Sequence, residues 1–214
     1  MLVEDMTYLV GTRVLLWRLV EEPQQLLALC REQEIPVEDL EKVPAKRQRE
    51  KAAERLLLCR AFGRPVTLLH DGQGAPLVQQ MDVNVSITHT MKLVALAWNG
   101  VRVIGLDAEQ CDRKQVIKVR DKFLNDREKS FIDPDDLAAH IIAWTAKEAI
   151  IKSERNSALD WTEGICLEPF SVGADETCMT AHCGSNCYRL ASRLLEGHYI
   201  TLAVPVTDQY NKEA

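Results

Sequence analysis

Hydrophobic positions in the first part of the chain predict a strand followed by two helices. Val14–Val20 is rich in β-branched and large apolar residues, which is typical of a strand. Pro23 suits the first turn of a helix that carries apolar residues at helical spacing, namely Leu26, Leu29 and Cys30. A longer helix is expected over residues 44–62, because Gly63-Arg64-Pro65 then supplies a glycine stop and a helix breaker.

The pattern then changes to that of strands. Val83–Ile87 alternates between apolar and polar residues, and Leu93–Trp98 is almost wholly apolar. Asn99-Gly100 is a typical hairpin turn, so we expect Leu93–Trp98 to pair with the next strand, Val101–Asp107.

Helical signals return in the second half of the chain. We expect helical segments at Arg113–Lys122 and Asp126–Phe131, followed by a long helix over residues 134–153. Asp133-Pro134-Asp135-Asp136 favours that helix start, because it offers a capping side chain, a proline in the first turn and acidic residues near the positive end of the helix dipole. From residue 161 the pattern predicts strands, the last of them at His198–Val204.

The order of elements is similar in the two halves of the chain. Each half has a long helix followed by antiparallel hairpins, with Lys92–Trp98 and Tyr199–Val204 as counterpart strands. The predicted fold class is therefore α+β, with two pseudo-symmetric halves in which a long helix packs on an antiparallel sheet. We place these halves at residues 1–100 and 101–214.

Composition and charge limit which functional classes this protein could belong to. The 214 residues are 46% hydrophobic and 27% charged, which permits a sizeable core. The formal charge of −6 argues against nucleic acid or an anionic membrane as a partner. No apolar stretch approaches the ~20 residues of a membrane span, and the start of the chain is acidic where a secretory signal would be basic. With an odd number of cysteines, seven, we expect reduced thiols and a cytoplasmic location.

Two carboxylates follow each other at the end of the strand Val101–Asp107. Side chains alternate along a strand, so Asp107 and Glu109 project from the same side. Neighbouring carboxylates repel unless a cation lies between them, and an oxygen-only pair suits Mg²⁺. A solvated turn is the alternative that this pattern leaves open.

The helix 134–153 carries a carboxylate within an apolar stripe, Leu137, Ile141, Trp144, Glu148 and Ile151. Its opposite face is also apolar, so we expect the helix to be buried. Glu148 then needs a partner, because uncompensated burial of a charge costs several kcal/mol. A cation shared with Asp107 and Glu109 would be one, and an ion pair with Lys152 is the structural alternative.

These segments together resemble the 4′-phosphopantetheinyl transferases of the Sfp type. That family carries G-[IV]-D-x-E at a strand end, here Gly105–Glu109, and later W-x-x-K-E-[AS]-x-x-K, here Trp144–Lys152. Upstream it has N-[IL]-S-H-[ST], matched by Ser86–Thr90, and between them R-F-[FL]-x-x-x-E, to which Lys122–Glu128 is similar. The motifs come in the family's order and cover roughly residues 44–155.

The resemblance implies transfer of 4′-phosphopantetheine from coenzyme A to a serine of an apo acyl or peptidyl carrier protein, with release of adenosine 3′,5′-bisphosphate. It implies a Mg²⁺ ion on the pyrophosphate, with Asp107, Glu109 and Glu148 as its ligands. Lys152 would contact the phosphate that passes to the serine. Glu148, or a metal-bound water held by Glu109, would take the serine proton. The active site would lie between the halves of a monomer.

Coenzyme A contacts are implied at seven further residues, His89, Thr88, Lys46, Arg47, Gly74, Pro76 and Lys147. One departure concerns the nucleotide, since the family usually has G-K-P where this chain has Gly74-Ala75-Pro76. The missing lysine removes a cation, whose role would shift to Arg64 or Lys92. Carrier proteins are acidic around their serine, so we expect a cationic run to steer the carrier in, namely Arg113, Lys114, Lys118, Arg120 and Lys122.

Three other functions compete with this interpretation. A catalytically impaired paralogue would bind coenzyme A or a carrier as a non-enzymatic module. A Mg²⁺-dependent nucleotide hydrolase would use the same carboxylates, although the chain has no P-loop sequence. A zinc-binding module would use Cys178, His182, Cys183 and Cys187, whose spacing differs from the usual C-x₂-C pairs.

Overall fold

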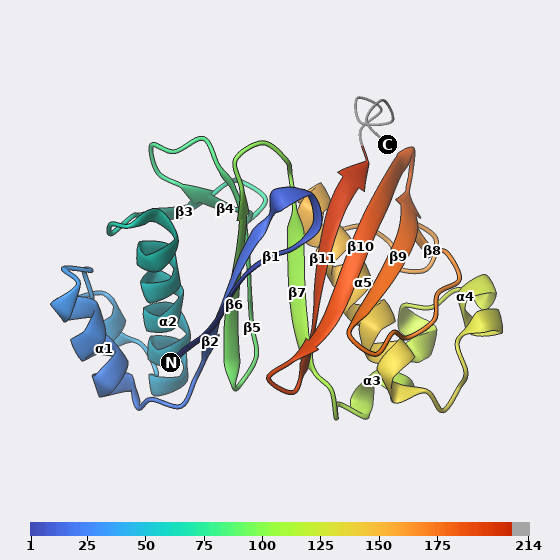
Figure 1. Cartoon of the computed structure of the whole chain (residues 1–214), viewed down its shortest axis with the longest axis horizontal. Coiled ribbons are helices and arrows are strands. Elements are labelled where there is room, and N and C mark those ends of the chain that lie inside the picture. The colour runs from blue at the N-terminus through green and yellow to red at the C-terminus, as the bar shows by residue number, and fades with distance from the viewer. Residues whose placement is uncertain (207–214) are drawn as a thin grey trace.

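Two antiparallel sheets form the frame of the molecule in a computed structural model that describes residues 1–206 (Figure 1). The first sheet has the order β1-β2-β6-β5-β4-β3, with strands β1 (Leu2–Thr7), β2 (Arg13–Arg18), β3 (Leu68–His70), β4 (Pro76–Val78), β5 (Asn84–His89) and β6 (Leu93–Asn99). The second has the order β7-β11-β10-β9-β8, with strands β7 (Gly105–Gln110), β8 (Ile165–Leu167), β9 (Glu176–Cys183), β10 (Asn186–Leu195) and β11 (His198–Val206).

The helices differ greatly in length. The two long ones are α2 (Ala45–Phe62) and α5 (Leu137–Glu154), and the shorter ones are α1 (Pro23–Glu32), α3 (Gln115–Lys118) and α4 (Asp126–Phe131). Short 3-10 turns occur at Leu9–Gly11, Leu40–Lys42 and Arg120–Lys122. Within the described residues, no helix has the length and apolar character needed to cross a membrane.

The two halves share one topology, which confirms the predicted fold class. In the first half α2 is followed by β3, β4, β5 and β6, and in the second half α5 is followed by β8, β9, β10 and β11. The sheet orders β2-β6-β5-β4-β3 and β7-β11-β10-β9-β8 correspond strand for strand, so β6 and β11 are counterparts.

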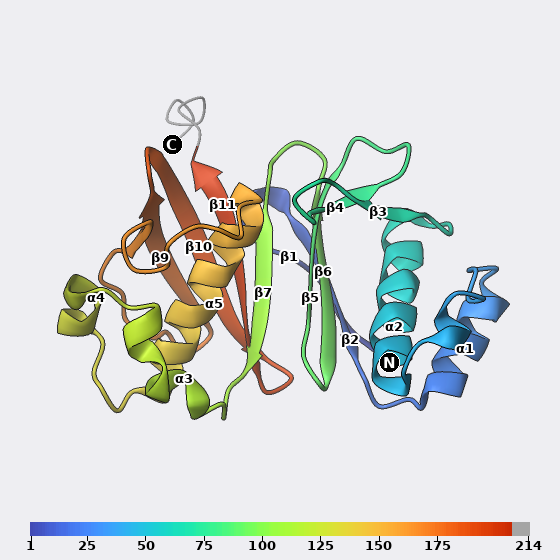
Figure 2. The ribbon, with the colours of Figure 1, turned by 180° about the vertical axis from the view of Figure 1, so that it is seen from behind.

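Three hydrophobic clusters hold these elements in four layers. One lies between the helices α1 and α2 and the first sheet, and another lies between α5 and the second sheet. The third joins the opposite faces of the sheets, where Val14 and Ala95 of the first meet Leu106 and Leu202 of the second. Each sheet is thus covered by a helix on one face and by the other sheet on its second face, and the second half lies beside the first along β5 and β7 (Figure 2).

The predicted hairpin at Asn99-Gly100 is wrong. Strand β6 already pairs with β2 on one edge and with β5 on the other, and β7 pairs with β11. The turn residues therefore begin a crossover, over residues 100–104, that carries the chain from the first sheet to the second. A local turn signal does not reveal that both edges of a central strand are occupied.

The long helix of the second half starts later than expected. The side chain of Asp136 caps it by accepting a hydrogen bond from the Ala139 amide at 2.9 Å, so the helix begins at Leu137. Asp133 holds the preceding turn instead, through a hydrogen bond from the Asp135 amide.

Candidate active site

A cleft of about 340 Å³ lies between the two long helices. One wall comes from α2 and from the segment β3–β5, including Arg47, Gly74 and His89, and the other comes from the end of α5, including Lys152 and Arg155. Figure 2 shows α2 and α5 on either side of β5 and β7. The cleft is therefore built by both halves of the chain.

The second wall depends on a close approach between β7 and α5. A Cβ atom on Gly105 would lie 1.7 Å from the carbonyl oxygen of Ala149, so only glycine fits here. This contact brings Lys152 against β7, where its Nζ donates to Asp107 Oδ1 at 2.7 Å and to the Leu106 carbonyl at 2.9 Å.

Two hydroxyl groups of β5 join this arrangement from the first half. Thr88 Oγ1 donates to Asp107 Oδ1 at 2.9 Å, and Ser86 Oγ accepts from the Leu106 amide at 2.9 Å. Both hydroxyl side chains are buried, and only 7% of Asp107 is exposed. Asp107 is thus oriented by groups from β5 and α5 together.

Glu148 lies one turn before Lys152 on α5 and is half-buried. Burial raises the pKa of its carboxyl group, and the charge of Asp107 raises it further, against the opposite effects of Lys152 and Arg113. Within residues 1–206 no hydrogen bond or ion pair of Glu148 is found, which leaves its oxygens free for a proton or a cation.

Glu109 is already neutralised by its neighbours. Its Oε2 pairs with Arg113, whose guanidinium also lies 5.7 Å from the centre of the Trp144 ring, and its Oε1 accepts from the Gln110 amide at 2.9 Å.

In the part of the chain that the structure describes, no group of three or more His, Cys, Asp or Glu side chains is arranged to hold a metal ion. The zinc module therefore finds no preformed site in these residues.

Two carboxylates nevertheless fit a magnesium ion that arrives with a phosphate ligand. Mg²⁺ usually takes one or two carboxylates and completes its shell with water and phosphate oxygens. Asp107 and Glu148 offer such a pair, and the charge of Asp107 adds to burial in raising the pKa of Glu148. A cation between them would remove this repulsion.

The residues predicted to contact coenzyme A are only partly brought together. Arg47, Gly74, Pro76 and His89 line the cleft. Lys46 does not; its side chain is 74% exposed and its Nζ lies 3.8 Å from Glu50. Thr88 faces Asp107 rather than the cleft.

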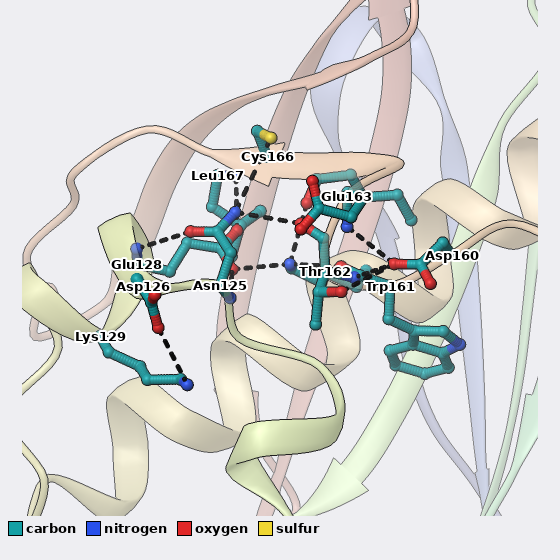
Figure 3. A network of polar contacts seen from close by, with 12 residues as sticks. Asn125, Asp126, Glu128, Lys129, Asp160, Trp161, Thr162, Glu163, Cys166 and Leu167 are labelled. Carbon is teal, nitrogen blue, oxygen red and sulfur yellow. Dashed lines mark hydrogen bonds and ion pairs between the residues drawn. The ribbon is translucent and has the colours of Figure 1, made fainter.

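The prediction for Lys147 needs correction, because this side chain is fully buried. Its Nζ donates to Glu128 Oε2 at 2.7 Å and to the carbonyl oxygens of Trp161 and Ile165 at 2.7 and 2.9 Å. Glu128 also accepts from the amides of Asn125 and Leu167, and Figure 3 shows these residues in one network. Lys147 therefore joins α5 to α4 and β8 and has no donor left for a ligand.

Sequence reasoning missed Ser86, Glu50 and Arg155 as residues of this region. Ser86 lies within a quoted motif, so its place in the motif was the available signal. Glu50 is buried beside the cleft, with Oε2 3.7 Å from His89 Nε2 and Oε1 without a hydrogen-bond partner. No pattern pointed to Arg155, which follows the last residue of α5.

Residues 103–203 match the family model of the 4′-phosphopantetheinyl transferase superfamily. The matched transferase segment includes Asp107, Glu109, Glu148 and Lys152, and it leaves out α2 and β5. No curated protein sequence matches the chain. The superfamily match indicates phosphopantetheine transfer as the class of reaction, with coenzyme A and a carrier protein as the partners that this superfamily generally uses.

Proposed function

We propose that this protein is an Sfp-type transferase that moves 4′-phosphopantetheine from coenzyme A to a serine of an apo acyl or peptidyl carrier protein. One observation carries the proposal. Lys152, which is paired with Asp107 in the matched transferase segment, reaches a cleft whose other wall comes from the first half of the chain. In this proposal residues 1–100 supply the coenzyme A wall, residues 101–214 supply the reacting groups, and one chain is sufficient.

The cleft suits a ligand that carries several phosphates. Arg47 lines it and makes no ion pair within the described residues, so its charge is available. His89 and the turn at Gly74–Pro76 line the same wall. These groups would hold the nucleotide while Lys152 faces the pyrophosphate across the cleft.

The transfer forms a bond between the serine oxygen and the pantetheine phosphorus and breaks the bond from that phosphorus to the bridging oxygen. Lys152 would neutralise charge on the phosphoryl group as it moves. Glu148 would accept the serine proton on a carboxylate oxygen, a role that its raised pKa favours at neutral pH. Mg²⁺, when bound by Asp107 and Glu148, with Glu109 joining if it leaves Arg113, would supply Lewis-acid stabilisation of the pyrophosphate.

Intact-mass spectrometry tests this function. The protein is incubated with coenzyme A, Mg²⁺ and an apo acyl carrier protein, and the carrier is weighed. We expect a gain of one phosphopantetheinyl group that is lost with EDTA and with Glu148→Gln. Coenzyme A binding without any mass gain on acyl and peptidyl carriers would instead identify a non-catalytic binding module.

A further inference from the structure

Two lysines around the cleft already have close partners. Lys51 Nζ lies 2.8 Å from both carboxylate oxygens of Glu54, and Lys152 Nζ lies 2.7 Å from Asp107. Arg155 differs, because its contacts are long: one nitrogen lies 3.4 Å from Asn84 Oδ1 and another lies 3.7 Å from Asp71 Oδ2. A guanidinium has five N–H donors, so Arg155 keeps most of them for a ligand in the cleft that it lines.

The backbone at Arg155 is unusual for a side chain of this size. The residue caps α5 in the left-handed conformation, with φ 53° and ψ 33°. Glycine is the usual residue at such a helix end, because a Cβ atom is unfavourable there. An arginine in this place is therefore unfavourable for the local backbone, but its side chain adds a positive charge to the lining of the cleft.

The acidic neighbour of Arg155, Asp71, is held mainly by its own turn and approaches the guanidinium only at 3.7 Å. Asp71 Oδ1 accepts from the amides of Gln73 and Ala75, both at 2.9 Å, so this carboxylate is already held by its own turn. The same turn includes Gly74-Ala75-Pro76, in which alanine stands where the resembled family usually has lysine. Arg155 and Ala75 thus line the same cleft from opposite halves of the chain, and Asp71 contacts both of them.

We propose that Arg155 is a phosphate-binding residue of the coenzyme A cleft, and that it supplies from the second half the positive charge that residue 75 lacks. The inference rests on the proposed function and assigns one of its specificity-determining residues. In the competing role, the Arg155 guanidinium only interacts with the negative end of the α5 dipole. Its removal would then change the stability of the protein without changing its affinity for coenzyme A.

Arg155→Gly separates the two roles, because it removes the guanidinium and places the favoured residue at the helix end. The dissociation constant for coenzyme A is measured by calorimetry, and the melting temperature is measured without ligand. We expect binding to weaken roughly tenfold, as for loss of a charge-assisted hydrogen bond to phosphate, while the melting temperature stays equal or rises. Glu34→Gly is the matched backbone control, since Glu34 is an exposed left-handed residue (φ 57°) away from the cleft.

A second variant tests whether a positive charge at residue 75 can replace that of Arg155. Ala75→Lys in the Arg155→Gly background should return the dissociation constant toward that of the wild type. Unchanged coenzyme A affinity in Arg155→Gly, or failure of Ala75→Lys to restore a weakened affinity, would overturn the inference. A wild-type protein that does not bind coenzyme A would overturn the proposed function first and this inference with it.

Discussion

Asp107 accepts hydrogen bonds from residues of both halves of the chain. Its Oδ1 accepts from Thr88 of β5 and from Lys152 of α5, and its charge adds to the effect of burial in raising the pKa of Glu148. One carboxylate thus pairs with a lysine that lines the cleft and also disfavours the ionised form of a second carboxylate. The strand-end sequence predicted the carboxylate but gave no indication that a hydroxyl from the other half would orient it.

Glu148→Gln should make the folded protein more stable at neutral pH while it abolishes transfer. The pKa of Glu148 is raised in the folded chain above its ordinary value of 4.5, so ionisation is less favourable there than in the unfolded chain. This residue therefore lowers stability progressively as the pH rises above that value. We expect the melting temperature of the variant to exceed that of the wild type by about 2 °C near neutral pH.

The same comparison at about pH 4 is the control, because Glu148 is then largely protonated in both states and the difference should shrink. Thermal melts at both pH values measure it. A variant that is less stable than the wild type at neutral pH would mean that the attraction to Lys152 and Arg113 outweighs burial and the repulsion from Asp107.

Among the elements, α5 is held in place by unusually close contacts with its neighbours. Gly105 lets β7 touch the backbone of this helix, and Lys147 ties the helix to α4 and β8 from within. These two contacts fix where Glu148 and Lys152 point. The long helix itself was predictable from its apolar pattern, whereas its distance from β7 depends on a residue without a side chain.

Gly105→Ala should displace α5 from β7 and break the Lys152–Asp107 pair. A Cβ atom would lie 1.7 Å from the Ala149 carbonyl oxygen and 2.9 Å from the Ser153 amide, and both are backbone atoms that cannot turn aside. We expect a loss of at least about 2 kcal/mol in the free energy of unfolding, together with loss of transfer. Gly100→Ala is the matched control, because no atom lies within 4 Å of its added Cβ. Urea denaturation checks both variants, and equal stability would contradict the close approach.

Lys147→Met should destabilise the protein without touching the cleft. The substitution leaves the buried carboxylate of Glu128 without its cation, which typically costs about 3–5 kcal/mol. Lys129→Met on the neighbouring helix is the control, since Lys129 forms only surface ion pairs with Asp121 and Asp126 and should change stability by about 0.5 kcal/mol or less. Free energies of unfolding in urea compare the two. If coenzyme A affinity fell while stability was unchanged, the sequence-based role of Lys147 would be restored.

These elements show which features of the structure could be predicted from the sequence. It predicted α2, which ends at Gly63 in the left-handed conformation as expected, and it predicted the shared order of the two halves. It misplaced Lys147, because a motif gives spacing along a helix and not which side faces the core. It missed Arg155, because left-handed helix ends favour glycine and carry no ligand signal. Residues that act by contact between distant segments were thus the hardest to find.

At the scale of the whole molecule, the four layers leave a cleft that residues of both halves line. The carrier protein would have to approach near β7 and α5, and the segment that follows β7 is cationic. Lys114, Lys118 and Lys122 are exposed there, and within the described residues none of them forms an ion pair. In a chain of net charge −6 this cationic run offers an acidic partner a local site of attraction.

Charge reversal in this cationic run should slow transfer by weakening the encounter with the carrier. We expect Lys118→Glu with Arg120→Glu to lower kcat/KM for an acyl carrier protein by about tenfold at low salt, with coenzyme A affinity unchanged, because neither residue lines the cleft. The difference should narrow as ionic strength rises, since salt screens exposed charges. Lys42→Glu with Arg189→Glu is the matched control, because these two exposed residues do not line the cleft and their reversal changes the net charge by the same amount. Initial rates of transfer at two salt concentrations test this prediction. Equal rates for the variant and the wild type at low salt would place the docking surface elsewhere.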